Sequence, residues 1–247
     1  MTRFPGKVAL VTGAGTGMGA ATARLLAARG AAVTLVGRRA DKLEDVARQI
    51  KEDGGQALPV TGDVSNAEDV ERAVARTVDS FGALHYAVNN AGVTGNFTPT
   101  ADMPLDAWHK VVAINLDGLF YGLKYQIPAI LDAGGGAIVN VSSVFADRGG
   151  PTVEYSAAKH AIRGLTRTAA QEYAARGIRI NELQPGVIDT EMTQANPDGT
   201  QQVAERGIPM RRVGRGEEIA TAVAFLLSDD ASYITGAHLA VDGGFLA

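Results

Sequence analysis

The feature that most constrains the fold of this chain is a regular alternation of short apolar segments with longer amphipathic stretches. The short segments are rich in Val, Ile and Ala and end in Gly, Asn or Ser, which is typical of strands. They are KVALVTG, AAVTLVG, QALPVTG, LHYAVNN, GAIVNVSS and IRINELQPG, with a last candidate at HLAVDGG. The stretches between them carry apolar residues at helical spacing, and two long helices are expected at about 105–131 and 155–175.

Nearly continuous apolar strands suit a parallel sheet, because both faces of such a sheet are covered by helices. Strand–helix alternation implies right-handed crossovers and a doubly wound arrangement. The chain contains no Pro/Ser-rich linker and no internal repeat. We therefore predict an α/β fold, a Rossmann-type doubly wound parallel sheet, in a single domain over residues 1–247.

Composition excludes several classes of function. The net charge of −4 argues against nucleic acid as a partner. The chain has no cysteine, and its four histidines show no metal-ligand spacing, so no metal site is expected; they are His85, His109, His160 and His238. The N-terminal apolar run Val8 to Val11 is too short for a signal peptide or a membrane span. We expect a soluble, cytoplasmic protein without a membrane partner.

A glycine-rich turn, GAGTGMG at 13–19, follows the first expected strand and opens the first expected helix. Glycines allow a tight turn and a close approach of the backbone to a ligand, and the helix start favours a pyrophosphate. The Gly-Lys-Ser/Thr of a P-loop is missing. The turn predicts dinucleotide binding, and an S-adenosylmethionine-type methyltransferase stays open as an alternative on this motif alone.

The end of the second expected strand bears on which nucleotide binds. NAD enzymes usually place Asp or Glu there, to bond the ribose 2′-hydroxyl. Here Gly37 occupies that place and Arg38 and Arg39 follow. Guanidinium groups suit a 2′-phosphate, so we predict NADP(H), with NAD(H) possible. The alternative is that the two arginines cap a surface turn.

A tyrosine and a lysine lie four residues apart in YSAAK, at Tyr155 and Lys159. On a helix this spacing places both side chains on one face, one turn apart. Taken alone, such a pair is most often a surface contact. An ammonium at about 4 Å in an effective dielectric of about 20 would favour a phenolate by about 4 kcal/mol. That corresponds to about three pKa units, which predicts a Tyr155 pKa near 7.

Several ordered motifs together resemble the short-chain dehydrogenase/reductase family, in its compact one-domain branch. They are TGAGTGMG at 12–19, NNAG at 89–92, SS at 142–143, YSAAK at 155–159, PGVIDT at 185–190 and ITGAHLAVDGG at 234–244. The resemblance extends over essentially the whole chain. It implies an oxidoreductase that interconverts carbonyl and alcohol groups with a nicotinamide cofactor.

The resemblance also implies roles for individual residues. Tyr155 would be the general acid or base, Lys159 would adjust its pKa and hold the nicotinamide ribose, and Ser143 would bond the substrate oxygen. Counting back from Tyr155 leaves Ser142 open as the alternative serine. Asn115 would interrupt the long helix with its side chain and hold a water linked to the lysine.

The resemblance and the glycine-rich turn together imply a set of cofactor-binding residues. The set is Gly13, Thr16, Gly17, Met18, Gly19, Arg38, Arg39, Asp63, Val64, Asn90, Ala91, Gly92, Tyr155, Lys159, Pro185, Gly186, Ile188 and Thr190. For Ile188, a plain core position remains the alternative. Glu182 and Gln184 replace small or apolar residues common in the family, and we assign them no role.

Three variable segments are expected to shape the substrate site, at 94–98, at 144–154 and in a substrate loop at about 191–212. We expect an apolar lining from Phe97, Val144, Phe145, Val153 and Met192. Relatives that reduce acyl-carrier-protein thioesters carry an arginine where this chain has Gln171. We therefore predict a small or medium neutral ketone or secondary alcohol, with a 3-oxoacyl-carrier-protein reductase and a non-catalytic nucleotide sensor as alternatives.

The family also suggests a homotetramer. The apolar C-terminus Phe245, Leu246 and Ala247 would be unusual as a solvated tail, and this supports an assembly that covers it.

Overall fold

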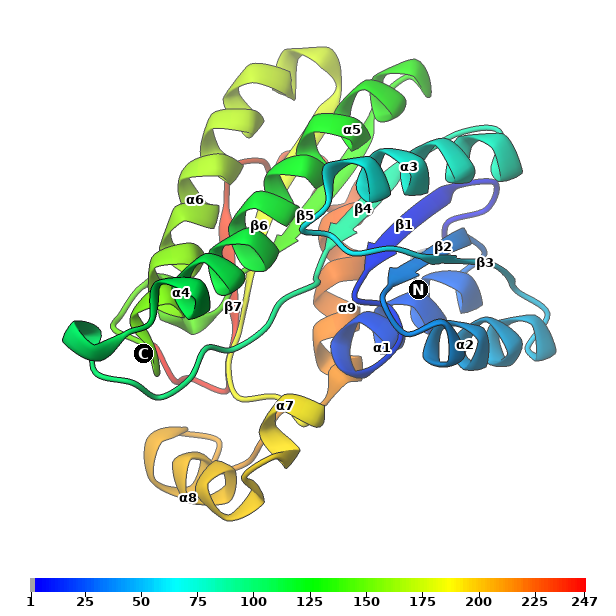
Figure 1. Ribbon diagram of the computed structural model, residues 1–247. Coiled ribbons are helices and arrows are strands. Elements are labelled where there is room, and N and C mark those ends of the chain that lie inside the picture. The colour runs from blue at the N-terminus through cyan, green and yellow to red at the C-terminus, as the bar shows by residue number, and fades with distance from the viewer. Residues whose placement is uncertain (1–2) are drawn as a thin grey trace.

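The computed structural model describes residues 3–247, which contain one seven-stranded sheet with every neighbouring pair of strands parallel. The strand order is β3-β2-β1-β4-β5-β6-β7 (Figure 1). The strands are β1 Val8–Thr12, β2 Ala32–Gly37, β3 Gln56–Thr61, β4 Tyr86–Asn89, β5 Gly136–Val141, β6 Ile178–Pro185 and β7 His238–Val241. The chain reverses its direction of winding between β1 and β4, so the predicted doubly wound sheet is confirmed.

Helices cover both faces of this sheet (Figure 1). Helices α1, α2 and α9 pack on one face, and α3, α5 and α6 pack on the other, each layer closing over its own apolar cluster. The helices are α1 Gly17–Ala28, α2 Ala40–Glu52, α3 Ala67–Phe81, α4 Leu105–Val112, α5 Gly118–Asp132, α6 Val153–Tyr173, α7 Glu191–Gln194, α8 Pro197–Gly207 and α9 Gly216–Leu227.

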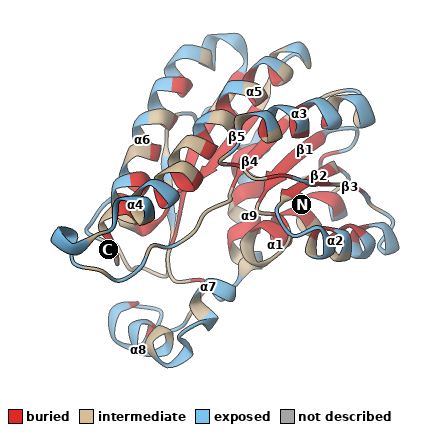
Figure 2. Cartoon of the chain, in the orientation of Figure 1, coloured by how far each residue is buried: buried red, intermediate tan, exposed pale blue. Residues whose placement is uncertain are grey.

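The central strands of the sheet are buried, and the edge strands are partly exposed (Figure 2). Every residue of β1 and β4 is buried, as expected for strands with a helix layer on each side. The edge strand β3 contains Pro59, which an edge tolerates because one side of its backbone makes no ladder hydrogen bonds. The opposite edge strand, β7, exposes His238 and Ala240.

The start of α6 positions the Tyr155–Lys159 pair. Thr152 is the N-cap, and its hydroxyl oxygen accepts a hydrogen bond from the Tyr155 backbone N–H at 3.4 Å. The helix therefore begins at Val153, and Tyr155 and Lys159 lie in its first two turns. Helix α6 packs beside β6 (Figure 1). Its residues Tyr155 and Lys159 line one cavity with the segments that follow β1, β4 and β5.

The structure differs from the sequence-based expectation in two helical regions. The long helix expected at about 105–131 is interrupted by a π-helical segment, Ala113–Asp117, between α4 and α5. A π segment carries one extra residue per turn, and Asn115 lies in its middle. The other difference is the region after β6, where α7, α8 and α9 are all helices that the hydrophobic pattern did not predict.

Candidate active site

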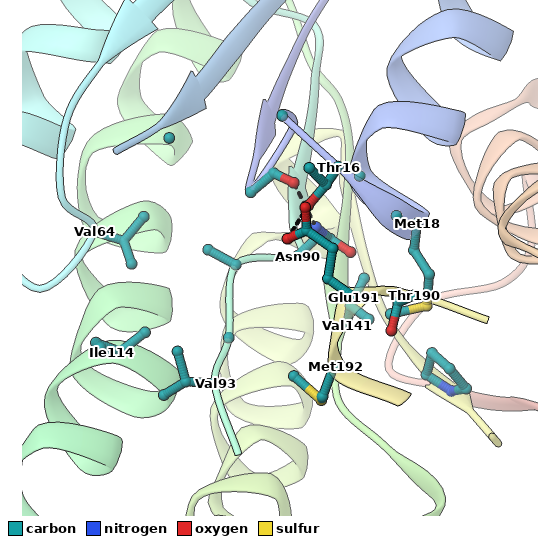
Figure 3. A pocket seen from close by; sticks show the side chains of 18 of the residues that line it. Thr16, Met18, Val64, Asn90, Val93, Ile114, Val141, Thr190, Glu191 and Met192 are labelled. Carbon is teal, nitrogen blue, oxygen red and sulfur yellow. Dashed lines mark hydrogen bonds between the residues drawn. The ribbon is translucent and has the colours of Figure 1, made fainter. Parts of the chain in front are cut away.

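A cavity of about 780 Å³ opens at the carboxyl ends of the central strands. It lies at the point where the sheet reverses its winding, the usual ligand site of an open α/β sheet. All eighteen residues of the predicted cofactor-binding set line this one cavity, as do Ser142 and Ser143. Figure 3 shows it with Thr16, Asn90 and Glu191 near one another and Val64, Val93 and Ile114 along another wall.

The glycine-rich turn forms a cradle that side chains would fill. A Cβ on Gly19 would lie 2.2 Å from the Gly13 carbonyl oxygen, and one on Gly13 would lie 2.9 Å from the Asn90 amide nitrogen. Gly13 also has a φ of +65°, which favours glycine. The N-cap Thr16 makes no side-chain capping bond, so the first N–H groups of α1 face the cavity without a side-chain acceptor. These features fit a pyrophosphate at the start of α1.

The segment after β4 is fastened directly to this turn. The Asn90 side chain donates to the Thr12 carbonyl at 2.9 Å, and the backbone N–H groups of Asn90 and Ala91 donate to the Thr12 hydroxyl at 3.0 and 3.1 Å. The NNAG motif and the TGAGTGMG motif therefore form one hydrogen-bonded unit. This unit is the floor of the cavity between the two halves of the sheet.

Two ion pairs stand at the outer end of the cavity. Arg39 donates to Glu191 at 2.7 Å and to the Thr16 hydroxyl at 3.3 Å, and both charged side chains are about half exposed, at 51% and 55%. Arg38 lies 4.0 Å from the Asp63 carboxylate. The Arg39 hydrogen bond holds the pKa of Glu191 below its ordinary value, so this pair is charged at neutral pH. Both arginines line the cavity where the end of β2 meets α7.

The inner end of the cavity holds Tyr155 and Lys159. The Lys159 ammonium donates to the Val141 carbonyl at 3.0 Å and lies 5.5 Å from the centre of the Tyr155 ring. Lys159 is 4% exposed, and burial lowers its pKa to about 8, while the charge of Glu182 acts in the opposite direction. The predicted one-face arrangement of the two side chains is present, and the ammonium is directed to a strand carbonyl.

The expected pKa of Tyr155, near 7, is wrong for this structure. Burial raises the pKa of Tyr155 above its ordinary value of 10.0, and a hydrogen bond with Ser143 only partly opposes this. The side chain still keeps part of its surface open to the cavity. A value near 7 counts one charge at short range and leaves out the desolvation of the phenolate. Tyr155 therefore keeps its proton at neutral pH.

The two serines after β5 point to different partners. The Ser142 hydroxyl donates to Glu182 at 2.5 Å, and both residues are buried. Ser143 lies beside the Tyr155 phenol, whose pKa it lowers, and caps the short 3₁₀ turn Val144–Ala146 by accepting from the Phe145 N–H at 3.2 Å. Of the two serines, Ser143 is thus the one beside the phenol.

Asn115 is buried behind the cavity and does not line it. Its side-chain oxygen accepts from the Val93 N–H at 2.8 Å, and its amide donates to the Val93 carbonyl at 2.9 Å. A Cβ added to Gly92 would lie 3.3 Å from the Asn115 oxygen and 3.6 Å from the Lys159 ammonium, so the three residues meet. Asn115 lies in the π-helical segment, and the interruption of the long helix at this residue is the one that the family resemblance implied.

The expected apolar lining is only partly present. Met192 lines the cavity, whereas Phe97 is 85% exposed and Val144 is buried. Phe145 lies edge-on to Tyr155 at 6.4 Å and to Phe245 at 6.2 Å. The C-terminal phenylalanine thus finds an aromatic partner in its own chain, next to the catalytic tyrosine candidate.

Sequence reasoning missed several residues that line the cavity. They are Leu43, Gly62, Val93, Ile114, Val141, Glu191 and Thr193. Most are neighbours of predicted residues, so their proximity was the available signal. Ile188 is both a core residue, at 5% exposed, and part of the lining, so its two alternatives are compatible.

Within residues 3–247, no three His, Asp or Glu side chains gather as a metal site would require. Among the same residues, no helix has the length and apolar character needed to cross a membrane.

Comparisons with known proteins place the chain among oxidoreductases. The family model described as enoyl-(acyl carrier protein) reductase matches residues 13–246. Cyclohexanol dehydrogenase of an Acinetobacter species is 43% identical over 244 residues, covering 98% of this chain and 96% of the relative. The 3-oxoacyl-[acyl-carrier-protein] reductase of Thermotoga maritima is 36% identical over 245 residues, covering 99% of each.

A third relative is similar in both sequence and structure. Levodione reductase of Leifsonia aquatica is 42% identical over 254 residues, covering 98% of this chain and 95% of the relative. A crystal structure of levodione reductase has a TM-score of 0.92 to this chain and covers 98% of both chains at 42% identity.

Proposed function

Because the chain belongs to the short-chain dehydrogenase/reductase family, whose members are oxidoreductases of alcohol and carbonyl groups, we propose that it interconverts a neutral ketone and a secondary alcohol with NADP(H). The observation that carries this proposal is the joint position of Ser143, Tyr155 and Lys159 on the cavity formed by the glycine-rich turn. A nucleotide sensor would not need a proton donor and an ammonium at the inner end of such a cavity.

Each inner residue has a role that its surroundings allow. Tyr155 keeps its proton because burial raises its pKa, and this suits donation of a proton to a carbonyl oxygen. Ser143, which lines the cavity with Tyr155, offers a second hydroxyl to the same oxygen. Lys159, fixed by Val141, directs its remaining N–H groups toward the cavity, where they suit ribose hydroxyls.

The cofactor would lie with its pyrophosphate on the start of α1 and its nicotinamide near Tyr155. Gly13, Gly17 and Gly19 line the cavity there and allow the tight packing of the turn against its neighbours. Ile188 and Thr190 also line the cavity. When bound, the nicotinamide supplies the hydride for carbonyl reduction and accepts it in the reverse direction.

The preference for NADP(H) rests on the outer end of the cavity. Gly37 offers no carboxylate to a 2′-hydroxyl, and Arg38 and Arg39 both line the cavity beside it. Arg39 is paired with Glu191, and the pair is exposed enough for a phosphate to displace the carboxylate at small cost.

The substrate class rests on the inner wall and on the relatives. Val93, Ile114 and Met192 give the wall an apolar character. The relatives named for cyclohexanol, for cis-4-hydroxycyclohexanecarboxylate and for levodione are 42–44% identical to this chain. We therefore favour ring ketones and the corresponding secondary alcohols. A carrier-bound 3-oxoacyl chain is the second candidate, favoured by the 36% identical Thermotoga maritima relative.

The test is a direct comparison of substrates under one set of conditions. Consumption of NADPH is measured with cyclohexanone, a ring diketone, an acyclic neutral ketone and a β-ketoacyl-carrier substrate at equal concentration. We expect the highest kcat/KM with a ring ketone. A clearly higher kcat/KM with the carrier substrate would reverse the order of the two candidates, and no turnover with any member would favour a sensor.

We also propose a cytoplasmic homotetramer. Exposed aromatic side chains support association of copies, since Tyr233 is fully exposed and Phe225 on α9 is 39% exposed. Light scattering is expected to give about four times the subunit mass of 25.6 kDa. A mass of one subunit would contradict the tetramer.

A further inference from the structure

Behind the inner end of the cavity lies a group of polar side chains, three of them buried and two partly exposed, to which the proposed function assigns no role. Glu182 on β6 accepts from the Ser142 hydroxyl at 2.5 Å and from Arg163 Nε at 3.1 Å. Arg163 also binds Asp147, which in turn accepts from the Gln184 amide at 2.9 Å. We call these five residues the Glu182 cluster: Ser142, Asp147, Arg163, Glu182 and Gln184.

Burial of the polar groups of the Glu182 cluster costs free energy of desolvation. Glu182 is 1% exposed and Gln184 is fully buried, on the strand next to the β7 edge. Replacing a buried ion pair by apolar side chains of similar volume is often neutral or stabilising. Stability alone therefore gives little reason for a carboxylate at this position.

Geometry links Glu182 to both sides of the catalytic arrangement. Its Ser142 partner is the residue before Ser143, and the Ser142 N–H donates to the Leu183 carbonyl at 2.8 Å. Its Arg163 partner lies one helical turn after Lys159 on α6, and Lys159 itself bonds Val141 on the neighbouring strand. Glu182 thus lies between the serine end and the lysine end of one active site.

We propose that Glu182 is a positioning residue, which fixes the Ser142–Ser143 strand end by hydrogen bonding and, through its pairing with Arg163 one helical turn after Lys159, places a negative charge near the lysine end of the site. The proposal rests on the roles that the proposed function gives to Ser143 and Lys159. It is supported by the pKa of Lys159, which burial lowers to about 8 and which the Glu182 charge raises.

Other groups in this region must be counted as well. The charged and titratable side chains here are Tyr155 and Arg163 from α6, Asp147 from the segment after β5, Glu182 from β6 and His238 from β7. Arg163 is shared by Asp147 and Glu182, whereas Glu182 is the carboxylate whose charge acts on Lys159. Asp147 therefore serves as a matched control.

The first experiment compares E182Q with D147N through the pH profile of kcat/KM. Each substitution replaces a carboxylate that pairs with Arg163 by a neutral amide of nearly the same shape. Loss of the Glu182 charge lowers the pKa of Lys159 further, so the alkaline loss of activity is expected to begin about one pH unit lower in E182Q. In D147N, the alkaline loss of activity is expected to begin at the same pH as in the wild type. Equal shifts in the two variants would mean that the cluster is only structural.

The second experiment needs no turnover and so separates this proposal from the proposed function. The rate at which trace acetic anhydride labels Lys159 is measured against pH by mass spectrometry in the wild type, E182Q and D147N. Half-maximal labelling is expected at a lower pH in E182Q alone. E182D, which keeps the charge, is expected to stay near the wild type, and it covers the case in which E182Q does not fold. Unchanged labelling in E182Q, or a shift in E182D as large as a shift in E182Q, would overturn the proposal.

Discussion

The two ends of the cavity differ in how far their charged side chains are buried. At the inner end, Lys159 is 4% exposed and bonds a strand carbonyl. At the outer end, Arg39 and Glu191 are each about half exposed and bond each other and Thr16. The inner charge is held by a helix and two strands of the sheet core, whereas the outer pair joins the end of β2 to the short helix α7.

This difference predicts how each end responds to substitution. A buried charge has a large desolvation cost and strong coupling to its neighbours, so small changes there have large effects. An exposed ion pair contributes about 0–1 kcal/mol and is screened by salt. The inner end is therefore suited to fixed chemistry, and the outer end to a cofactor preference that a few substitutions can alter.

Tyr155→Phe gives the largest effect that we expect. The variant loses the proposed proton donor and keeps the ring that lies against Phe145. General acid–base catalysis contributes about 10²–10⁴-fold, so kcat is expected to fall by about 10³-fold with little change in the Kd for NADPH. The measurements are steady-state kinetics and fluorescence titration of NADPH. Retention of more than a tenth of kcat would remove Tyr155 from the acid role.

Lys159→Met tests whether the inner charge is held at a cost to stability. The pKa of Lys159 is about 8 against an ordinary value of 10.5, so the unfolded chain binds more protons between these pH values. The free energy of unfolding of the wild type therefore rises with pH between about pH 8 and pH 10.5. Below pH 8, the buried ammonium is charged and destabilises the fold to its full extent. We expect the variant to lose about 100-fold or more in kcat/KM and to bind NADPH more weakly.

The same variant is expected to unfold with a free energy about 2 kcal/mol larger at pH 7. The pKa difference corresponds to about 3 kcal/mol, and loss of the bond to Val141 offsets about 1 kcal/mol. The gain should vanish by about pH 10.5. Urea titrations at pH 7 and above pH 10 provide the measurement, and equal differences at both pH values would show that the ammonium is not destabilising.

The lining residues of both ends were largely predictable from the sequence, but the partners of the charged side chains were not. Motifs that follow consecutive strands must meet where parallel strands end, so the order of TGAGTGMG, NNAG and YSAAK along the chain is enough to assign them to one site. The interruption of the long helix at Asn115 was also expected, from the family resemblance. The tyrosine pKa was wrong because a single pairwise charge cannot represent burial, which depends on the whole environment.

The pairings of Glu191 and Glu182 had no comparable signal. Arg39 and Glu191 are 152 positions apart, and Ser142 and Glu182 are 40 apart. No local periodicity encodes such contacts, which depend on where α7 lies and on which face of β6 is turned to α6. Sequence reasoning could only mark Glu182 as unusual. The helices α7 and α8 carry few buried residues, so their weak apolar pattern gave no basis for prediction.

Arg38→Asp tests the cofactor preference of the outer end. A carboxylate there repels a 2′-phosphate and accepts from a 2′-hydroxyl, so the ratio of kcat/KM for NADPH to that for NADH is expected to fall by about 10–100-fold. Arg48→Asp is the matched control, because Arg48 is exposed on α2 and does not line this cavity. A wild type that already prefers NADH would contradict the NADP(H) proposal, whatever the variant does.

Glu191→Gln gives the smallest effect and makes the sharpest comparison of the two ends. In the wild type, Glu191 accepts a hydrogen bond from the Arg39 guanidinium, the group that would bind a 2′-phosphate. Glutamine removes the competing charge, so the Kd for NADPH is expected to fall a few-fold, by less than about tenfold, while the Kd for NADH stays unchanged. Glu205→Gln is the control, since Glu205 is exposed on α8, bonds Gln201 and does not line this cavity.

Salt and pH then separate this pair from the inner lysine. The gain in Glu191→Gln should shrink as salt is raised, because exposed charges are screened. It should stay constant between pH 6 and pH 8, because Arg39 holds the pKa of Glu191 below its ordinary value of 4.5 and the wild-type carboxylate is charged throughout that range. A gain that instead changed between pH 6 and pH 8 would point to a group near the inner end. An equal gain for NADH would show that Glu191 obstructs the cavity as a whole and does not compete for Arg39.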